Sequence, residues 1–170
     1  NVNLTILMLN NQIYGLTKGQ YSPTSEIGKV TKSTPFGSVD HPFNPISVAI
    51  GAEATFVART HDMDRKHMIE VFRRAHEHKG ASIVEIYQNC NIFNDGAFEI
   101  FTEKGTKAQE TLFLEQGKPL TFGAANDKGI KLDGFTPKIV DFSKGGSADD
   151  CWVHDENDMY KAQILVRIFD

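Results

Sequence analysis

The feature that most constrains the fold of this chain is the short apolar run Leu4–Leu9, which ends abruptly at Asn10 and Asn11. An apolar run of this length between polar residues is typical of a strand buried on both faces of a parallel sheet. A polar loop with two glycines follows through Gly19, so we expect the strand to end at the asparagine pair. Ligands of open α/β sheets bind beyond the carboxyl ends of the strands, and this loop is therefore the expected place for a site.

Size and charge limit the classes of protein. The chain has 170 residues, of which 40% are hydrophobic, as is ordinary for one soluble domain that buries about two-thirds of its unfolded surface. Its net charge is -4, and its 18 Lys and Arg are scattered rather than clustered. No apolar run approaches the roughly 20 residues that span a bilayer, and no leader pattern precedes the first strand. We therefore expect a cytoplasmic protein that binds neither nucleic acid nor a membrane.

The two cysteines and the start of the chain carry further expectations. Cys90 and Cys151 lie far apart, without the Cys-x-x-Cys spacing of zinc and iron–sulfur sites, so two reduced thiols are expected. The first strand begins almost at Asn1, and no initiator Met precedes it. Our hypothesis is that the chain is the carboxyl-terminal piece of a longer polypeptide whose upstream strands complete the sheet.

The residues after the loop predict alternating helices and strands. A stretch rich in Pro and Gly over 21–45 indicates a long irregular loop. The elements expected next are a helix opened by Pro45 and ended by Gly51, a strand over 55–59, a helix from Asp62 or Asp64 through Lys79 that Gly80 ends, and a strand over 82–87. In the longer helix the expected core-facing stripe is Met68, Ile69, Phe72 and Ala75. This order predicts a right-handed parallel α/β layer.

The pattern of apolar residues and glycines in the sequence changes at about Asn94. Short apolar runs at 111–114, 131–132 and 138–140 alternate with glycines, which predicts a small ribbon-and-loop extension. Met159 to Ile168 is expected to form a closing helix, with Tyr160 and Ile164 in step with Ile168. We therefore divide the chain into residues 1–95 and an extension over 96–170.

The residues after the first strand resemble a known family. Asn10–Ser25 (NNQIYGLTKGQYSPTS) is similar to the second half of the thiamine diphosphate motif in the β subunit of 2-oxoacid:ferredoxin oxidoreductases. The likeness continues through His41–Pro45, Gly51-Ala52, Phe56–Arg59 and Val84–Cys90, so it covers roughly the first 95 residues. The fold that it implies is α/β: a three-layer thiamine diphosphate-binding fold with a mostly parallel sheet, incomplete at the N-terminus, plus a small C-terminal extension.

The resemblance implies roles for the loop. Mg²⁺ that holds a diphosphate takes hard oxygen ligands, and by resemblance Asn11 gives its side-chain oxygen and Ile13 its main-chain carbonyl. Tyr14 would wall the site, and main-chain amides after it would approach the diphosphate. The family's acidic Gly-Asp-Gly segment is not found in these 170 residues and would lie upstream. Taken alone, Asn-Asn and Gly also make an ordinary turn after a buried strand. The cofactor-binding residues implied are Tyr14, Gly15, Leu16 and Thr17.

Lys18 is the residue that bears on substrate choice. Pyruvate-using relatives tend to carry a small residue here, whereas Lys resembles the pattern of enzymes that take larger or dicarboxylic 2-oxoacids. Its ammonium group would pair with the distal carboxylate of such a substrate, although a solvated surface Lys is the alternative. Leu16 replaces the Asn of the pyruvate pattern, which leaves the pocket less polar and points the same way.

Other polar residues are weaker candidates. His41 lies in the long loop, where it is a lesser candidate for substrate contact. Cys90 follows a strand and is expected to be a buried structural thiol rather than a catalytic one. Trp152, beside Cys151, is expected to pack in a terminal strand. A solvated polar face, rather than a metal site, explains the remaining acidic and imidazole cluster, which is His61, Asp62, Asp64, His67, His76 and His78.

The function that the resemblance implies is oxidative decarboxylation of a 2-oxoacid, of the 2-oxoglutarate type. Carbon dioxide leaves, coenzyme A takes the acyl group, and electrons pass to ferredoxin through an iron–sulfur cluster elsewhere in the complete subunit or complex. The family activates its cofactor with a Glu of a partner α subunit, so no catalytic residue is assigned here and the isolated chain is expected to be inactive. Two alternatives stay open: a pyruvate or branched-chain 2-oxoacid oxidoreductase on the same scaffold, and a catalytically silent fragment or interaction module.

Overall fold

The computed structural model describes residues 2–168 and divides into two compact units, with the boundary between Phe98 and Glu99. The sequence-based prediction had put this boundary at residues 95 and 96. Each unit has its own hydrophobic cluster and is described by itself. Among the described residues, no helix combines the length and apolar character needed to cross a bilayer.

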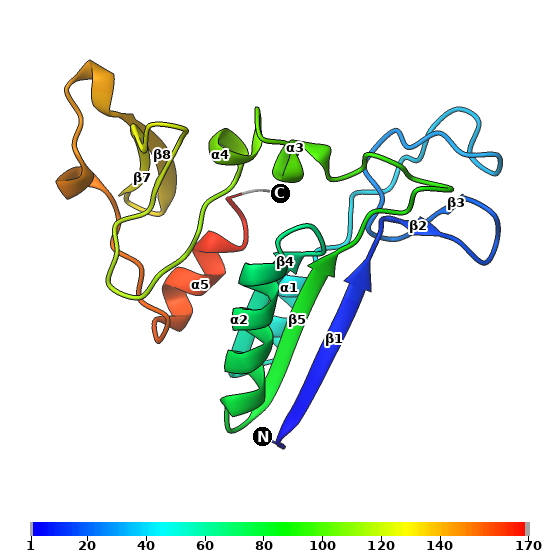
Figure 1. Cartoon of the computed structure of the whole chain (residues 1–170), viewed down its shortest axis with the longest axis horizontal. Helices are drawn as coiled ribbons and strands as arrows, with labels where there is room; N and C mark the ends of the chain where they lie inside the picture. The colour runs from blue at the N-terminus through cyan, green and yellow to red at the C-terminus, as the bar shows by residue number, and fades with distance from the viewer. Residues whose placement is uncertain (1, 169–170) are drawn as a thin grey trace. The chain divides into compact units, whose positions relative to one another are not determined.

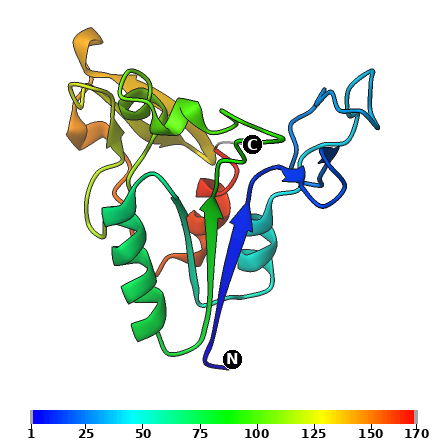
Figure 2. The same ribbon diagram turned by 45° about the vertical axis from the view of Figure 1, so that its right-hand side comes forward.

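The first unit is built on a three-stranded parallel sheet. Its strands are β1 (Leu4–Asn10), β4 (Phe56–His61) and β5 (Ala81–Tyr87), in the order β1-β5-β4. Figures 1 and 2 show the helices α1 (Pro45–Gly51) and α2 (Arg65–Glu77) on opposite faces of this sheet. The predicted parallel α/β layer is confirmed.

Side-chain caps set the beginnings of both helices. The Asn44 side chain accepts a hydrogen bond from the Ser47 amide at the start of α1, and Asp64 accepts one from the His67 amide at the start of α2. α2 ends at Glu77, somewhat before the predicted stop at Gly80.

The core of the first unit lies between α2 and the sheet. Val71 and Ala75 of α2 pack with Val84 and Ile86 of β5. The stripe expected on α2 is therefore partly wrong, because Ile69 is 57% exposed and Val71 faces the sheet instead.

The expectation that the first strand is buried on both faces is wrong. In the described part of the chain β1 bonds to β5 alone, and Leu4, Ile6, Leu7 and Leu9 are each 44–64% exposed. The reason is positional: α1 and α2 pack mainly on β4 and β5, and among the described residues β1 has one bonded edge. β5 instead has strands on both sides, and its Val84 is fully buried.

A hairpin and a long irregular segment follow β1. β2 (Ile13–Tyr14) and β3 (Gln20–Tyr21) pair antiparallel. Residues 22–44 then hold an isolated bridge between Thr31 and Thr34 and no longer strand or helix. The predicted irregular loop is thus confirmed.

The second unit is a small antiparallel sheet with short helices. The strands β6 (Thr121–Phe122), β7 (Lys128–Asp133) and β8 (Thr136–Asp141) pair in sequence order. The predicted runs at 131–132 and 138–140 lie within β7 and β8, but 111–114 forms no strand. The helical elements are α3 (Glu99–Thr102), α4 (Lys107–Glu110), the 3₁₀ helices η1 (Phe142–Lys144) and η2 (Ala148–Asp150), and α5 (Met159–Leu165).

The core of the second unit centres on Leu120, Ile130 and Trp152. Trp152 is 7% exposed, so its expected packing is confirmed, but it lies outside any strand. The helix α5 is shorter than predicted and presents one face to the core. Ile164 lies on that face and packs against the cluster, whereas Tyr160 is 84% exposed.

Candidate functional site

The residues predicted for the site lie on one turn and hairpin after β1. The hairpin closes on itself, since the Lys18 amide donates to the Gly15 carbonyl (3.0 Å) and the Gly19 amide donates to the Tyr14 carbonyl (3.1 Å). The Thr17 hydroxyl also donates to the Tyr14 carbonyl (3.2 Å). These three hydrogen bonds define the geometry of the turn.

Of the two glycines in the hairpin, Gly19 is the one that the backbone geometry requires. Gly19 has φ +99, and a Cβ built there would lie 3.3 Å from Cδ1 of Phe93. Gly15 is less restricted, because its Cβ would lie 3.9 Å from the same ring. Phe93 thus packs closely against the hairpin, and the backbone at Gly19 is in the left-handed region that favours glycine.

Asn10 is the buried member of the asparagine pair. It is 7% exposed, and its Nδ2 donates to Oε1 of Glu85 (2.7 Å). Its Oδ1 accepts from the Gln12 amide (3.1 Å) and from Oγ1 of Thr24 (2.8 Å). The sequence analysis missed this role, because an Asn after a strand also fits a simple turn.

Asn11 is the partly exposed member. Its Oδ1 accepts from the Ile13 amide at 3.2 Å, which leaves a second lone pair on that oxygen. Its main-chain carbonyl accepts from Nδ2 of Asn94, itself 6% exposed, at 2.9 Å. Ile13 is 4% exposed, so it fixes the start of the hairpin in the protein interior.

The other predicted site residues are more exposed. Leu16 is 99% exposed and Tyr14 is 47% exposed. Lys18 is also exposed and has φ +63. The roles assigned to these residues by resemblance stay predictions.

A small cavity of about 290 Å³ lies beside the hairpin. The Tyr21 hydroxyl donates to Oδ2 of Asp40 (2.8 Å) there, and this hydrogen bond raises the pKa of Tyr21. The structure thus brings Tyr14 and His41, two candidates from the sequence, to one cavity. Its lining residues are Tyr14, Gln20, Tyr21, Pro23, Asp40, His41 and Phe43.

His61 differs from the expected solvated face, whereas His76 is exposed as expected. His61 ends β4 and is 9% exposed. His67 Nδ1 lies 2.9 Å from Oγ1 of Thr60, and His78 Nε2 lies 2.7 Å from Oγ1 of Thr55. Across residues 2–168, no group of three His, Cys, Asp or Glu is placed to hold a metal ion.

Cys90 is partly exposed rather than buried, which corrects the expectation. Hydrogen bonds from the backbone amides of Phe93 and Ile92 to its sulfur lower the pKa of the thiol. Cys151 is buried, and desolvation raises its pKa. The two thiols therefore differ in reactivity.

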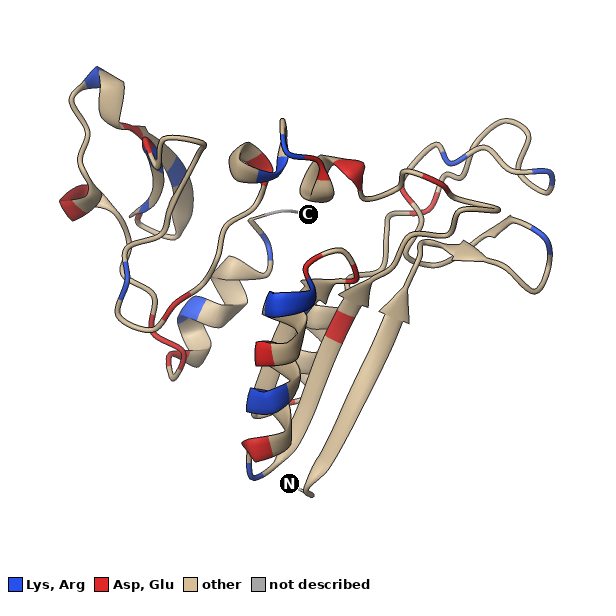
Figure 3. Ribbon diagram, in the orientation of Figure 1, with Lys and Arg blue, Asp and Glu red and all other residues tan. Residues whose placement is uncertain are grey.

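Both signs of charge are interspersed over the chain, as Figure 3 shows. On α2, Arg73 bonds both Glu70 (2.6 Å) and Glu77 (2.5 Å), with all three side chains about half exposed. The one acidic residue of β5, Glu85, differs because it is 1% exposed and pairs with Arg59 Nε at 2.7 Å. A buried carboxylate beside the candidate site is the least ordinary charge in the first unit.

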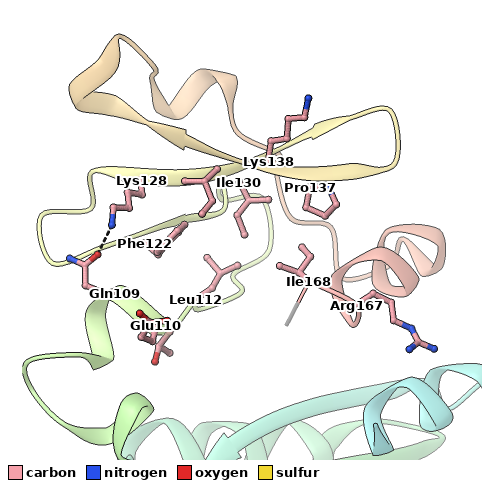
Figure 4. Close-up of a pocket in the computed structure, with 12 residues that line it drawn as sticks. Gln109, Glu110, Leu112, Phe122, Lys128, Ile130, Pro137, Lys138, Arg167 and Ile168 are labelled. Carbon is pink, nitrogen blue, oxygen red and sulfur yellow. Dashed lines mark hydrogen bonds between the residues drawn. The ribbon is translucent and has the colours of Figure 1, made fainter. Parts of the chain in front are cut away.

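A larger cavity of about 550 Å³ lies within the second unit. In Figure 4, Lys128 reaches along it to Gln109, with Nζ 2.9 Å from Oε1. None of the predicted cofactor-binding residues lines this cavity, so the predicted cofactor site does not depend on it. The apolar residues that line the cavity of the second unit are Leu112, Phe122, Ile130, Pro137, Ile139 and Ile168.

Comparison with known proteins identifies a family whose match includes the parallel sheet and the turn after β1. Residues 1–86 match the family described as thiamine pyrophosphate enzyme, C-terminal TPP binding domain. The chain is 52% identical, over its whole length and 46% of the relative's, to the 2-oxoglutarate oxidoreductase subunit KorB of Mycobacterium tuberculosis. It is 45% identical to the 2-oxoacid:ferredoxin oxidoreductase subunit beta of Saccharolobus solfataricus, over 56% of this chain and 31% of that subunit.

A solved structure is similar as well. It is a 2-oxoglutarate:ferredoxin oxidoreductase from Magnetococcus marinus with 2-oxoglutarate, coenzyme A and succinyl-CoA bound, and it is 41% identical with a TM-score of 0.54. The alignment covers 56% of this chain and 33% of that chain, and the chain spans less than half the length of each of these relatives. The resemblance to 2-oxoacid:ferredoxin oxidoreductase β subunits is confirmed. Because the family match covers half of the chain, including the parallel sheet and the turn after β1, this chain belongs to the thiamine pyrophosphate enzymes and carries their C-terminal TPP-binding domain.

Proposed function

We propose that this chain is the thiamine diphosphate-binding part of the β subunit of a 2-oxoglutarate:ferredoxin oxidoreductase. The reaction is oxidative decarboxylation of 2-oxoglutarate to succinyl-CoA and carbon dioxide, with two electrons passed to ferredoxin. Bound thiamine diphosphate supplies the electron sink that makes loss of carbon dioxide possible. This function belongs to the complete complex, of which the chain is one part.

The observation that carries the proposal is the full-length identity of 52% with a 2-oxoglutarate oxidoreductase subunit. The match to the Saccharolobus 2-oxoacid enzyme spans 95 residues, whereas the mycobacterial match also includes the second unit. The likeness to a subunit whose name specifies 2-oxoglutarate therefore extends beyond the cofactor-binding part.

The turn after β1 fits part of a magnesium site. Asn11 presents an amide oxygen that is partly exposed and accepts one hydrogen bond within its turn, and hard oxygen is what Mg²⁺ prefers. Ile13 would add its main-chain carbonyl. The carboxylate ligand would come from a Gly-Asp-Gly segment that these 170 residues do not contain.

The hairpin would hold the other end of the cofactor and the substrate. The amides of Gly15, Leu16 and Thr17 would face the diphosphate, and Tyr14 would form the wall. Lys18, whose side chain is exposed in this chain, would pair with the distal carboxylate of 2-oxoglutarate. The chain thus contributes binding and orientation.

The rest of the machinery would come from outside the chain. We propose an α subunit that carries the activating Glu, an iron–sulfur cluster elsewhere in the complex, and ferredoxin and coenzyme A as reaction partners. The cytoplasmic location expected from the sequence stays a prediction.

The experiment that tests the proposal uses the complete β subunit purified with its α subunit. Calorimetric titration with thiamine diphosphate and Mg²⁺ is expected to show tight binding, and Asn11→Ala is expected to weaken it strongly because an inner-sphere oxygen is lost. The control is Asn91→Ala, which removes an exposed amide that lies beyond β5. Unchanged affinity in the Asn11 variant would refute the magnesium assignment.

Turnover with a substrate panel separates the two rivals. We expect reduction of ferredoxin with 2-oxoglutarate and coenzyme A to exceed that with pyruvate or a branched-chain 2-oxoacid. Faster turnover of pyruvate would favour the first rival. A complex that neither binds the cofactor nor turns over would favour a silent interaction module.

A further inference from the structure

Glu85 is a carboxylate enclosed in the sheet beside the proposed cofactor turn. It is 1% exposed and lies on the central strand β5. Arg59 of β4 is its register partner, and Met8 of β1 is its partner on the other side. Asn10 follows two residues after Met8, on the same face of the sheet, so Glu85 can reach the residue at which β1 ends.

The Glu85 carboxylate uses its two oxygens for two different partners. Oε2 accepts from Nε of Arg59, and Oε1 accepts from Nδ2 of Asn10, each at 2.7 Å. Asn10 in turn accepts on Oδ1 from the Gln12 amide and from the Thr24 hydroxyl. A continuous chain of hydrogen bonds therefore runs from Arg59 through Glu85 and Asn10 to the backbone of the turn.

Asn11 lies between Asn10, whose side chain belongs to this series of hydrogen bonds, and Gln12, whose backbone amide is its last member. Asn10 precedes it, and the Gln12 amide is tied to the Asn10 side chain. Gln12 has φ +54, a conformation that few residues adopt without support. The contact between Glu85 and Asn10 thus helps to hold the backbone next to Asn11, whose own Oδ1 accepts from the Ile13 amide.

We infer that Glu85 is a positioning residue for cofactor binding, which holds the turn so that Asn11 presents its amide oxygen to the magnesium ion of the diphosphate. This inference rests on the proposed function and adds a residue of β5 to the site. Outer groups that orient metal ligands typically change metal affinity by 10–100-fold when they are replaced, and we expect an effect of that order.

The charge of Glu85 matters because its neutral counterpart cannot satisfy the same partners. In Glu85→Gln, one carboxylate oxygen is replaced by an NH₂ group, which faces either the Arg59 Nε–H or the Asn10 NH₂ group, and both of these are donors. If Asn10 turned its own amide over, its NH₂ group would face the Gln12 amide, which is also a donor. Every arrangement therefore contains one contact between two donors, and the turn is expected to shift.

A double change restores the pattern. In Asn10→Asp combined with Glu85→Gln, the introduced amide donates to the introduced carboxylate and still accepts from Arg59. The carboxylate at position 10 accepts from Gln12 and Thr24 as the native oxygen does. The negative charge moves from position 85 to position 10, its hydrogen-bond partner, and no two donors face each other.

The test compares these variants in the complete α and β complex. We expect Glu85→Gln to raise the dissociation constant of thiamine diphosphate, measured by titration at fixed Mg²⁺, on the order of 10–100-fold, and the double variant to regain most of the affinity. Ser82→Ala is the matched control, because Ser82 is fully buried on the same strand and donates to the Ala75 carbonyl away from the turn. It is expected to lower the melting temperature and leave the affinity unchanged.

Several results would overturn the inference. Wild-type affinity in Glu85→Gln would do so, as would an equal loss of affinity in Ser82→Ala, or no recovery in the double variant. If Glu85→Gln does not fold, the inference is tested with the double variant alone. Near-complete loss of cofactor binding in a folded double variant contradicts the inference. Failure of the wild-type complex to bind the cofactor, or of Asn11→Ala to weaken binding, would instead refute the proposed function itself.

Discussion

The guanidinium of Arg59 lies 2.7 Å from the carboxylate of Glu85, across two neighbouring strands on which the two residues are in register. The Arg59 side chain is 35% exposed, whereas that of Glu85 is 1% exposed. The same guanidinium lies 4.9 Å from the centroid of the Tyr87 ring. The acid is thus enclosed and its partner reaches solvent, so the stability of the sheet depends on keeping the cation in place.

Arg59→Ala is expected to lower the free energy of unfolding by about 3 kcal/mol, because it leaves a buried carboxylate without its cation. This loss of stability is at the low end of the range for buried ion pairs. The Arg59 side chain is partly exposed, so in the variant water can enter its place and solvate the carboxylate of Glu85. Urea denaturation followed by circular dichroism measures the change.

Arg73→Ala is the matched control for this prediction. Arg73 also pairs with acids, Glu70 and Glu77, but all three are about half exposed on α2. The loss there is expected to be much smaller than for Arg59→Ala, because water screens an exposed ion pair. Equal losses in the two arginine variants would contradict the importance given to burial.

The hairpin provides a test of its backbone geometry. Gly19→Ala is expected to destabilise the hairpin by about 1–2 kcal/mol, because φ is +99 and the new Cβ would lie 3.3 Å from the Phe93 ring. Hydrogen exchange of the amides at positions 18 and 19, which close the hairpin, should quicken roughly 5- to 30-fold. Gly15→Ala, whose Cβ meets the ring at 3.9 Å, should leave the exchange close to that of the native chain. Similar exchange in both variants would refute the prediction.

The thiols provide a prediction about pH. Backbone amides of Phe93 and Ile92 lower the pKa of Cys90, and burial raises that of Cys151, so Cys90 carries the larger thiolate fraction at any pH below both values. In the chain without cofactors, iodoacetamide is expected to alkylate Cys90 faster at neutral pH. The difference should shrink as the pH rises through both pKa values. Peptide mapping by mass spectrometry at several pH values measures it, and faster reaction at Cys151 would contradict it.

The local signals of the sequence predicted most elements of the first unit. Pro45 and Gly51 bound α1, and Asp64 caps α2, because these residues satisfy or end a helix through their own geometry. The parallel order also followed from the alternation of elements. Burial was harder to predict, since the apolar run of β1 reads as an interior strand, whereas its exposure depends on how many neighbours it has.

The candidate site was predicted in part. The end of the apolar run predicted a polar loop after the first strand, and the structure forms a turn and a hairpin there. The support from Glu85 was not predicted, because Glu85 and Asn10 are 75 residues apart and meet through strand register. A charged residue inside an otherwise apolar strand, Ser82–Tyr87, was the available signal. Cys90 was expected to be buried because it follows a strand. The amides that meet its sulfur come from a loop without periodicity, which a sequence pattern does not reveal.

Substrate choice gives the last prediction, which concerns Lys18. In the complete enzyme, Lys18→Ala is expected to raise KM for 2-oxoglutarate about 10- to 100-fold, because a charge-assisted hydrogen bond to the distal carboxylate is lost. Pyruvate has no second carboxylate, so its KM should change little. Steady-state reduction of ferredoxin with each substrate measures the two values. Lys32→Ala removes another exposed Lys, from the irregular segment over 22–44, and should leave both values unchanged. Equal effects of Lys18→Ala on the two substrates would mean that Lys18 is a solvated surface residue, and that selectivity for a dicarboxylic substrate resides elsewhere in the complex.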